Sequence, residues 1–191
     1  MTKDVSAPGA LELVRQFVNS LDLDHPERDP FLTSASANGW LDEHGFDGIS
    51  LEAGDMPKVR DLREALRMEL LSHAGEEAAG SWTRLATLLH GAGLELVFDP
   101  REGMRLEASA EAGFPAIRGA IASRIYDAVR SEQWRRLKAC RKETCLFAFY
   151  DRSKNGSGTW CDMAVCGNRV KAERRRARER TGAGHRHKAS D

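Results

Sequence analysis

The 191-residue sequence has no apolar run long enough to cross a bilayer, since a spanning helix needs about 20 predominantly apolar residues in a row. It also lacks an apolar segment near its start, which reads MTKDVSAPGA, so nothing there is typical of a secretory signal. We therefore expect no membrane partner and a cytoplasmic location.

The common catalytic motifs are missing as well. The sequence has no P-loop, no GxGxxG, no GxSxG and no HExxH, which are the short patterns that bring phosphates, dinucleotides, a serine nucleophile or catalytic zinc to a site. The six histidines, at positions 25, 44, 73, 90, 185 and 187, follow no such pattern. No residue pattern supports an enzyme, and we expect a protein without catalytic activity.

Cysteine is scarce, but its placement is informative. The four cysteines are Cys140, Cys145, Cys161 and Cys166. Each close pair encloses four residues, which lies within the usual gap of zinc fingers. Four thiolates satisfy zinc tetrahedrally and leave no open position for catalysis, so we predict one structural zinc ion per chain. The alternative is a pair of disulfides, which a reducing cytosol disfavours.

The residues around the cysteines predict a small finger. Residues 146–150 are typical of a short aromatic strand, residues 151–158 (DRSKNGSG) of a turn, and Thr159 of the start of a returning strand, so the metal would clamp a β-hairpin. The Gly-Asn pair after Cys166 suits a tight turn, and residues 169–180 are mostly good helix formers. Knuckle, hairpin and helix follow in the order of a treble-clef-like finger.

The formal net charge of zero hides two oppositely charged parts. Residues 1–133 carry 13 Lys and Arg against 23 Asp and Glu, a charge of −10, whereas residues 134–191 carry 16 against 6, a charge of +10. This asymmetry indicates a polyanionic partner for the basic part. Seven basic residues lie between positions 169 and 180.

A helix over this basic run would carry several cations on one face, which is suited to the phosphates of a nucleic acid. A charge run alone does not distinguish DNA from RNA. Arg169 has an alternative role, as a hydrogen-bond donor inside the finger. The predicted nucleic-acid contacts are Asn168, Arg169, Lys171, Arg174, Arg175 and Arg178.

Residues 8–132 predict a mainly α-helical domain with one β-hairpin. Apolar residues recur at helical spacing in several segments, and they alternate with polar ones on both sides of the turn PREG at 100–103. The expected helices lie at about 10–22, 34–44, 56–73, 76–90 and 114–130.

Three details of these helices are open to test. Asp55 is expected to cap the third helix, and Trp82 of the fourth is expected to face inward. The outer face of the third helix is expected to be solvated, as charge runs usually are. That face consists of Lys58, Arg60, Arg63, Glu64 and Arg67.

The motif CGNR at residues 166–169, within FYDRSKNGSGTWCDMAVCGNRVKAERRRARER, resembles the CGNR zinc finger at the C-terminus of bacterial proteins described as stress-induced transcription regulators. FVNSLD at 17–22 and VRDLREALR at 59–67 resemble the helical ABATE-type domain that precedes that finger. The resemblance implies a DNA-binding regulator. Residues 8–132 would then sense a ligand or form dimer contacts, 133–181 would be the zinc finger with its basic helix, and 182–191 would be a disordered tail.

The partners expected on this interpretation are double-stranded DNA and, at the N-terminal domain, a small-molecule effector or a second copy of the chain. A different class of function is a zinc-stabilised module that binds a protein or an RNA without reading a DNA sequence.

Overall fold

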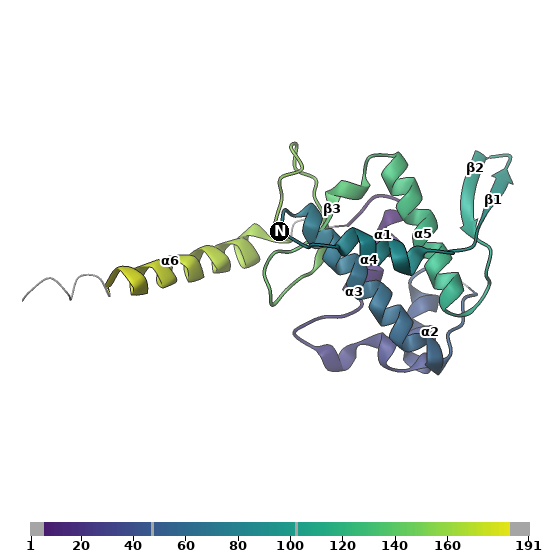
Figure 1. The fold of residues 1–191 in the computed structure, drawn as a ribbon, viewed down its shortest axis with the longest axis horizontal. Helices are drawn as coiled ribbons and strands as arrows, with labels where there is room; N and C mark the ends of the chain where they lie inside the picture. The colour runs from purple at the N-terminus through teal and green to yellow at the C-terminus, as the bar shows by residue number, and fades with distance from the viewer. Residues whose placement is uncertain (1–5, 47, 102, 184–191) are drawn as a thin grey trace, which may run out of the picture.

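In the part of the chain that the structure describes, four α-helices are followed by a hairpin, a fifth helix, a second hairpin and a sixth helix (Figure 1). The computed structural model describes residues 6–46, 48–101 and 103–183. The α-helices are α1 (Leu11–Asn19), α2 (Ser34–Glu43), α3 (Met56–His73), α4 (Ser81–Leu89), α5 (Gly113–Arg130) and α6 (Asn168–Ala183). The strands are β1 (Leu94–Asp99), β2 (Gly103–Ala108), β3 (Leu137–Ala139) and β4 (Ala148–Tyr150). Single helical turns, η1 to η5, lie at Pro26–Arg28, Pro30–Leu32, Ala53–Asp55, Trp134–Arg136 and Met163–Gly167.

The mainly α fold that the sequence predicts is confirmed, with its C-terminal hairpin and helix. In the part of the chain that the structure describes, no helix is both long enough and apolar enough to pass through a bilayer. Of the predicted tail, α6 includes the first two residues, and 184–191 lie outside the described residues.

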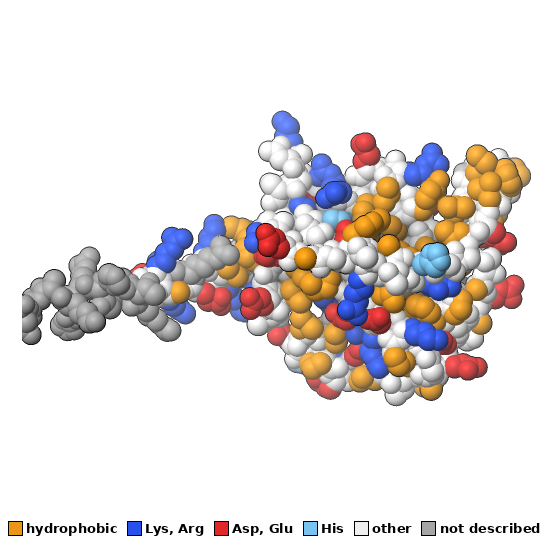
Figure 2. Space-filling model, viewed as in Figure 1, with side chains coloured by type: hydrophobic (Ala, Val, Ile, Leu, Met, Phe, Trp, Pro, Cys, Tyr) orange, Lys and Arg blue, Asp and Glu red, His pale blue; other side chains and the backbone are white. Residues whose placement is uncertain are grey.

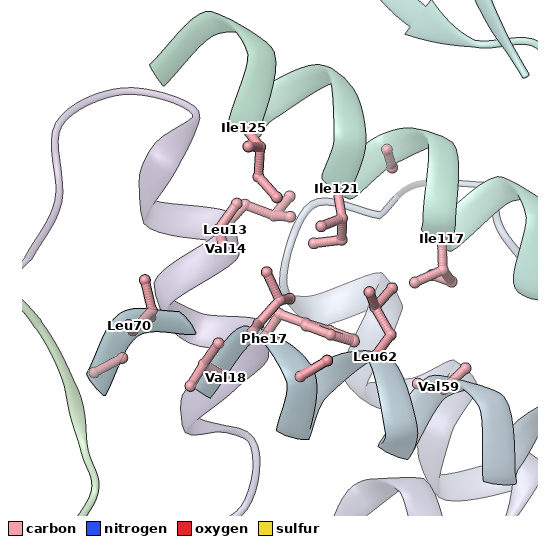
Figure 3. Packing of buried hydrophobic residues seen from close by; sticks show 14 of the residues in the cluster. Leu13, Val14, Phe17, Val18, Val59, Leu62, Leu70, Ile117, Ile121 and Ile125 are labelled. Atoms are coloured by element: carbon pink, nitrogen blue, oxygen red, sulfur yellow. The ribbon is translucent and has the colours of Figure 1, made fainter. Parts of the chain in front are cut away.

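The centre of the molecule is the packing of α1, α3 and α5. Figure 3 shows Phe17 of α1, Leu62 of α3 and Ile121 of α5 pointing into one interior, and none of the three has exposed side-chain surface. Their neighbours recur at spacings of three and four residues, so each helix buries one face.

The starts of two helices follow different rules. Thr33 caps α2, because its hydroxyl accepts a hydrogen bond from the backbone N–H of Ser36 at 3.2 Å. Asp55 occupies the predicted N-cap position of α3, but its side chain makes no capping hydrogen bond to that helix. The turn η3 precedes α3, and the Asp55 carboxylate accepts from the N–H of Glu52 at 3.0 Å instead.

The helix α4 is shorter than predicted and turns a different face inward. It begins at Ser81 after Gly80, which adopts a left-handed φ of 78°. Ser81 and Leu85, four residues apart, are buried, so the adjacent Trp82 points away from the core. The prediction that Trp82 faces inward is wrong, since the residue is 56% exposed.

The hairpin β1–β2 projects from the body on the side opposite α6 (Figure 1). Its strands pair in the predicted antiparallel arrangement, with Phe98 opposite Met104. The base of the hairpin lies against α5, where a Cβ on Gly119 would be 2.6 Å from that of Ala108, so glycine permits the close approach. At the outer end Phe98 and Met104 are exposed, and Figure 2 shows hydrophobic side chains gathered there.

Two arginines on the supposed solvated face of α3 are buried. Arg63 and Arg67 are each 2% exposed. Arg63 binds both carboxylate oxygens of Asp29, at 2.7 and 2.8 Å, and Arg67 donates to the carbonyl oxygens of Val18 and Leu146. The expectation of a solvated face is therefore wrong at these positions, because the end of α1 and loops from elsewhere in the chain supply partners for the guanidinium groups.

The first half of the C-terminal segment packs directly on the helices. Trp134, Leu137, Ala139, Ala148 and Tyr150 belong to the same buried cluster as the core of α1, α3 and α5. The side chain of Asn19, at the end of α1, pairs with the backbone of Ala148: its amide donates to the carbonyl at 2.9 Å and its oxygen accepts from the N–H at 2.7 Å. β4 is thus fixed to α1 as well as to β3.

Candidate metal centre

The four cysteines come together although 25 residues of chain separate the first from the last. Their sulfur atoms all lie within 4.8 Å of one another. Cys145 and Cys166 each have their Sγ 3.7 Å from the Sγ of Cys161. These distances are far longer than a disulfide bond of about 2.05 Å, and all four cysteines are free thiols, so the disulfide alternative is not supported.

The spacing of the sulfur atoms matches a tetrahedral zinc site. With Zn–S bonds of about 2.3 Å, the edge of an S₄ tetrahedron is about 3.8 Å. The observed separations of 3.7 Å agree with that edge. Four soft donors occupy all four positions, so the residues present fit one zinc ion. The ion would fold and hold this segment and would leave no position for a substrate.

The pKa values of the thiols also indicate that the four cysteines bind a cation. Hydrogen bonds from Cys145 and Cys161 lower the pKa of Cys140 to about 2. The hydrogen bond to Cys140 in turn raises the pKa of Cys161. Burial, together with the nearby negative charge, raises the pKa of Cys166 to about 12. One thiolate therefore forms readily, and further thiolates need the positive charge of a metal, whose binding releases their protons.

The first cysteine pair lies in the turn of a hairpin. Cys140 follows β3 directly, and its N–H donates to the carbonyl of Phe147 at 3.0 Å. Leu146, just after Cys145, has a left-handed φ of 48°, which reverses the chain into β4. The predicted hairpin is thus wrong in its partners, because β4 pairs with β3 and Thr159 contributes only one carbonyl, to the N–H of Arg141.

The second pair frames the turn η5, which leads into α6. Asp162 caps η5, since its carboxylate accepts from the N–H groups of Ala164 at 2.6 Å and Val165 at 3.0 Å. A Cβ on Gly167 would lie 2.4 Å from the sulfur of Met163, so a larger residue there would displace this exposed, flexible side chain. The tight turn predicted at Gly167 and Asn168 is absent, because Gly167 ends η5 and Asn168 begins α6.

A buried ion pair organises the loop between the two cysteine pairs. Lys138 of β3 donates to Asp151 at 2.9 Å and to the carbonyl of Gly158 at 3.0 Å, and both charged residues are at most 3% exposed. Asp151 also accepts from the N–H groups of Ser153 and Gly158. A Cβ on Gly158 would lie 2.8 Å from the carboxylate, so only glycine fits there.

Sequence reasoning treated DRSKNGSG as a turn and missed the central role of Asp151. An aspartate that begins a turn and binds the N–H two residues later is a known local pattern, and this signal was available. The partner, Lys138, could not be predicted from this local pattern, since it lies thirteen residues upstream.

We expect Asp151→Asn to lower the free energy of unfolding of the zinc-loaded protein by about 3–5 kcal/mol, because it leaves the charge of Lys138 buried without its partner. Denaturant titration measures the change, and Glu143→Gln, an exposed carboxylate nearby, is the matched control. The double variant Asp151→Asn, Lys138→Met should recover much of the loss. Equal stability of Asp151→Asn and the control would contradict the assigned role.

The same pair predicts a pH dependence. Burial raises the pKa of Asp151, but the hydrogen bonds from Lys138, Ser153 and Gly158 outweigh it and hold the pKa below its ordinary value. A lowered pKa means that the pair stabilises the fold fully above the unfolded-state pKa, about 4, and that this contribution is lost as the pH falls below it. The Asn variant should lack this part of the acid dependence.

The predicted nucleic-acid contacts all lie on α6. Asn168, Arg169, Lys171, Arg175 and Arg178 are exposed, and the side chain of Arg174 lies outside the described residues. For Arg169, the alternative of a hydrogen bond inside the finger finds no support, since none is present among the residues that the structure describes.

A hairpin that carries two cysteines in its turn, followed by a helix that begins at the second pair, defines a structural zinc finger of four cysteines. Residues 136–179 match the family model of the CGNR zinc finger, so this segment of the chain is a CGNR zinc finger. The predicted zinc ion is thereby confirmed as the cofactor of this site. No curated protein matches the chain, and the resemblance of the N-terminal part to an ABATE-type domain stays a prediction.

Proposed function

We propose that the protein is a DNA-binding transcription regulator that presents α6 to double-stranded DNA from a zinc-held base. The observation that carries the proposal is the position of α6. The helix starts at Asn168, two residues after the fourth cysteine, packs against η5 and then leads away from the body (Figure 1). Its side chains from Glu173 onward are exposed wherever they are described.

The composition of α6 agrees with a polyanionic partner. Residues 169–180 contain seven basic residues and only two acidic ones, Glu173 and Glu179. A helix that is polar on every side gains little from packing, and Arg175 with Glu179, 3.5 Å apart, is an exposed pair of small energetic value. Such a helix is best explained by a partner that supplies the missing contacts.

Geometry favours duplex DNA over duplex RNA. The 16 residues of α6 make a rod about 24 Å long at 1.5 Å per residue. The major groove of B-DNA admits an α-helix, whereas the deep, narrow major groove of A-form RNA does not. Lys171, Arg175 and Arg178 follow one face of the rod by spacings of four and three residues, so they would meet the same groove wall.

We expect the double variant Lys171→Ala, Arg175→Ala to weaken DNA binding at every sequence tested. Loss of two phosphate contacts should flatten the slope of log affinity against log salt by about 1.8, at about 0.9 for each phosphate. The control is Arg28→Ala, Lys58→Ala, which removes the same charge from exposed sites on the body. If both double variants give the same slope, α6 is not the interface.

The proposal as a whole is tested by metal content and DNA affinity measured together across a salt series, before and after chelation. One zinc ion per chain, with preference for one duplex over bulk DNA and RNA that disappears on chelation, supports a DNA reader. Zinc with equal binding to all polyanions would instead leave an interaction module with a basic helix, which is the second candidate function.

A further inference from the structure

A cavity of about 640 Å³ opens where α3, α4, α5 and η4 meet. This volume is in the range of small-molecule sites. Two tryptophans line it, Trp82 of α4 and Trp134 of η4. None of the four cysteines lines it, so this site is separate from the metal centre. Because η4 leads directly into β3, the cavity lies where the helical body meets the finger.

Trp134 brings a buried hydrogen-bond donor to the wall of this cavity. The residue is 5% exposed. Its Nε1 is buried and has no hydrogen-bond partner among the residues that the structure describes. An indole N–H can only donate. A buried tryptophan usually directs this group to an acceptor, because a buried donor that stays unbonded costs free energy. The N–H of Trp134 is therefore available to a ligand that supplies an acceptor.

The polar side chains beside the indole are already bonded to other groups. The carboxylate of Glu69 accepts from the hydroxyl of Ser81 at 2.8 Å, and its other oxygen is 3.2 Å from Nε2 of His73. Nδ1 of His73 donates to the carbonyl oxygen of Leu137 at 2.8 Å. The rings of His73 and Trp134 meet edge-to-face, with centroids 5.2 Å apart. Both imidazole nitrogens are thus engaged elsewhere, and neither accepts from the indole.

The charges at the cavity balance one another. A hydrogen bond between Glu69 and His73 needs one proton, and the pair has no net charge whether that proton belongs to the imidazole or to the carboxyl group. The other two charged residues of the lining are Glu132 and Arg135, one negative and one positive, and both are exposed. Burying a charged ligand without an opposite charge costs far more than burying a neutral polar group. The balance therefore favours an uncharged ligand.

Arg135 adds donors at the rim. Its guanidinium group makes no hydrogen bond or ion pair with another described residue, and a guanidinium has five N–H groups and no acceptor. The unused hydrogen-bonding capacity of Trp134 and Arg135 thus consists of donors alone. A carbonyl oxygen, which has two lone pairs, can accept from both groups.

An apolar wall faces the same space. Trp82 is 56% exposed and Val129 is 50% exposed, and both line the cavity. Burial of Ser81 and Leu85 holds α4 in place without Trp82, so the fold does not account for this large apolar side chain at the surface. An indole offers a broad apolar face on which a planar ligand can stack.

We propose that this cavity binds a small, uncharged carbonyl compound with an aromatic body. Its carbonyl oxygen accepts from Nε1–H of Trp134 and from Arg135, and its ring lies against Trp82 and Val129. The side chains of Trp82, Val129, Glu132 and Arg135 are exposed, and exposed side chains change rotamer rapidly, so they can turn to admit the ligand to the buried N–H. This gives a chemical class to the effector expected at the N-terminal domain, and it does not depend on DNA binding.

The test is NMR of the indole N–H groups in the full-length, zinc-loaded protein. The chain has four tryptophans, and Trp134→Phe assigns the resonance of Trp134 by its loss. The probes are acetophenone, ethylbenzene, which has a similar shape and no acceptor, and the charged benzylamine and benzoate. Acetophenone should bind most tightly and should move the Trp134 indole proton downfield, as a new hydrogen bond does.

Two variants separate the hydrogen bond from the apolar contacts. Trp134→Phe keeps an aromatic ring and removes the N–H, so the ratio of acetophenone affinity to ethylbenzene affinity should fall roughly tenfold, the scale of one buried hydrogen bond. A residue that is only structural would change both affinities alike. Trp82→Ala, at an exposed site, should weaken both probes. Phe98→Ala, an exposed aromatic on the hairpin β1–β2, is the control and should bind both normally.

Tighter binding of benzylamine or benzoate than of acetophenone, no binding of acetophenone, an unmoved Trp134 resonance, or an unchanged affinity ratio in Trp134→Phe would each overturn the proposal. A protein that binds acetophenone in the expected way but binds no DNA would refute the proposed function and leave this inference standing. Preference for one DNA duplex together with no acetophenone binding would do the reverse.

Discussion

Cys161→Ser is expected to abolish zinc binding and unfold the finger. Cys161 lies 3.7 Å from two of the other sulfur atoms, so its loss removes a central ligand. Metal binding contributes roughly 10–16 kcal/mol to folding in small structural zinc sites. Zinc content should fall from one ion per chain to near zero, and the amides of residues 137–168 should lose their protection from hydrogen exchange.

The helical body should survive this loss in part. The core of α1, α3 and α5 is closed by residues such as Phe17, Leu62 and Ile121, so most helical circular dichroism should remain, with a lower unfolding temperature. Thr144→Ser, an exposed residue beside Cys145, is the matched control and should keep its zinc. Zinc retained in Cys161→Ser at normal stability would refute the assigned site.

Asp29→Ala should cost about 3–5 kcal/mol of stability, because it leaves the buried guanidinium of Arg63 without a counter-charge. The pair is bidentate, at 2.7 and 2.8 Å, and Arg63 also lies over the ring of Phe31. Denaturant unfolding measures the loss. Glu27→Ala, a nearby exposed carboxylate, should be close to neutral.

A double variant separates the missing partner from the missing contacts. Asp29→Ala with Arg63→Met removes both charges, and replacing a whole buried pair is often nearly neutral, so much of the stability should return. Burial raises the pKa of Asp29, but the hydrogen bonds from Arg63 and from the N–H of Phe31 outweigh this effect and hold the pKa below its ordinary value. The stabilisation by this pair is therefore present above about pH 4 and is lost as the pH falls.

The zinc site could be predicted because its information is local. Two close cysteine pairs and the short chain between them fix the ligand set, and the confirmed site uses all four. The pairing of the strands in the finger's hairpin could not be predicted from the sequence. The aromatic run at 146–150 identified one strand, but its true partner, Leu137–Ala139, has no alternation long enough to indicate a strand.

The body shows the same limit of local reasoning. Helical periodicity located α1, α3 and α5, yet it placed Arg63 and Arg67 in solvent, because the groups that bind them, in α1 and in two loops, come from distant parts of the chain. Trp82 was placed in the core because it lies at helical spacing with Leu85 and Leu89, whereas the buried face of α4 is set by Ser81 and Leu85. The nucleic-acid contacts on α6 stay predictions, since no feature of the chain alone reports a partner.

The finger and the helices share one buried cluster, which limits whether either part can fold as a separate fragment. Leu137 and Tyr150 lie in the same buried cluster as Phe17. A fragment that starts near residue 133 would therefore expose apolar side chains that the helices cover in the whole protein. Transplanting the finger alone onto another protein should therefore fail. For the same reason the hairpin β3–β4, which carries the first cysteine pair, is held in a fixed position on the helical body.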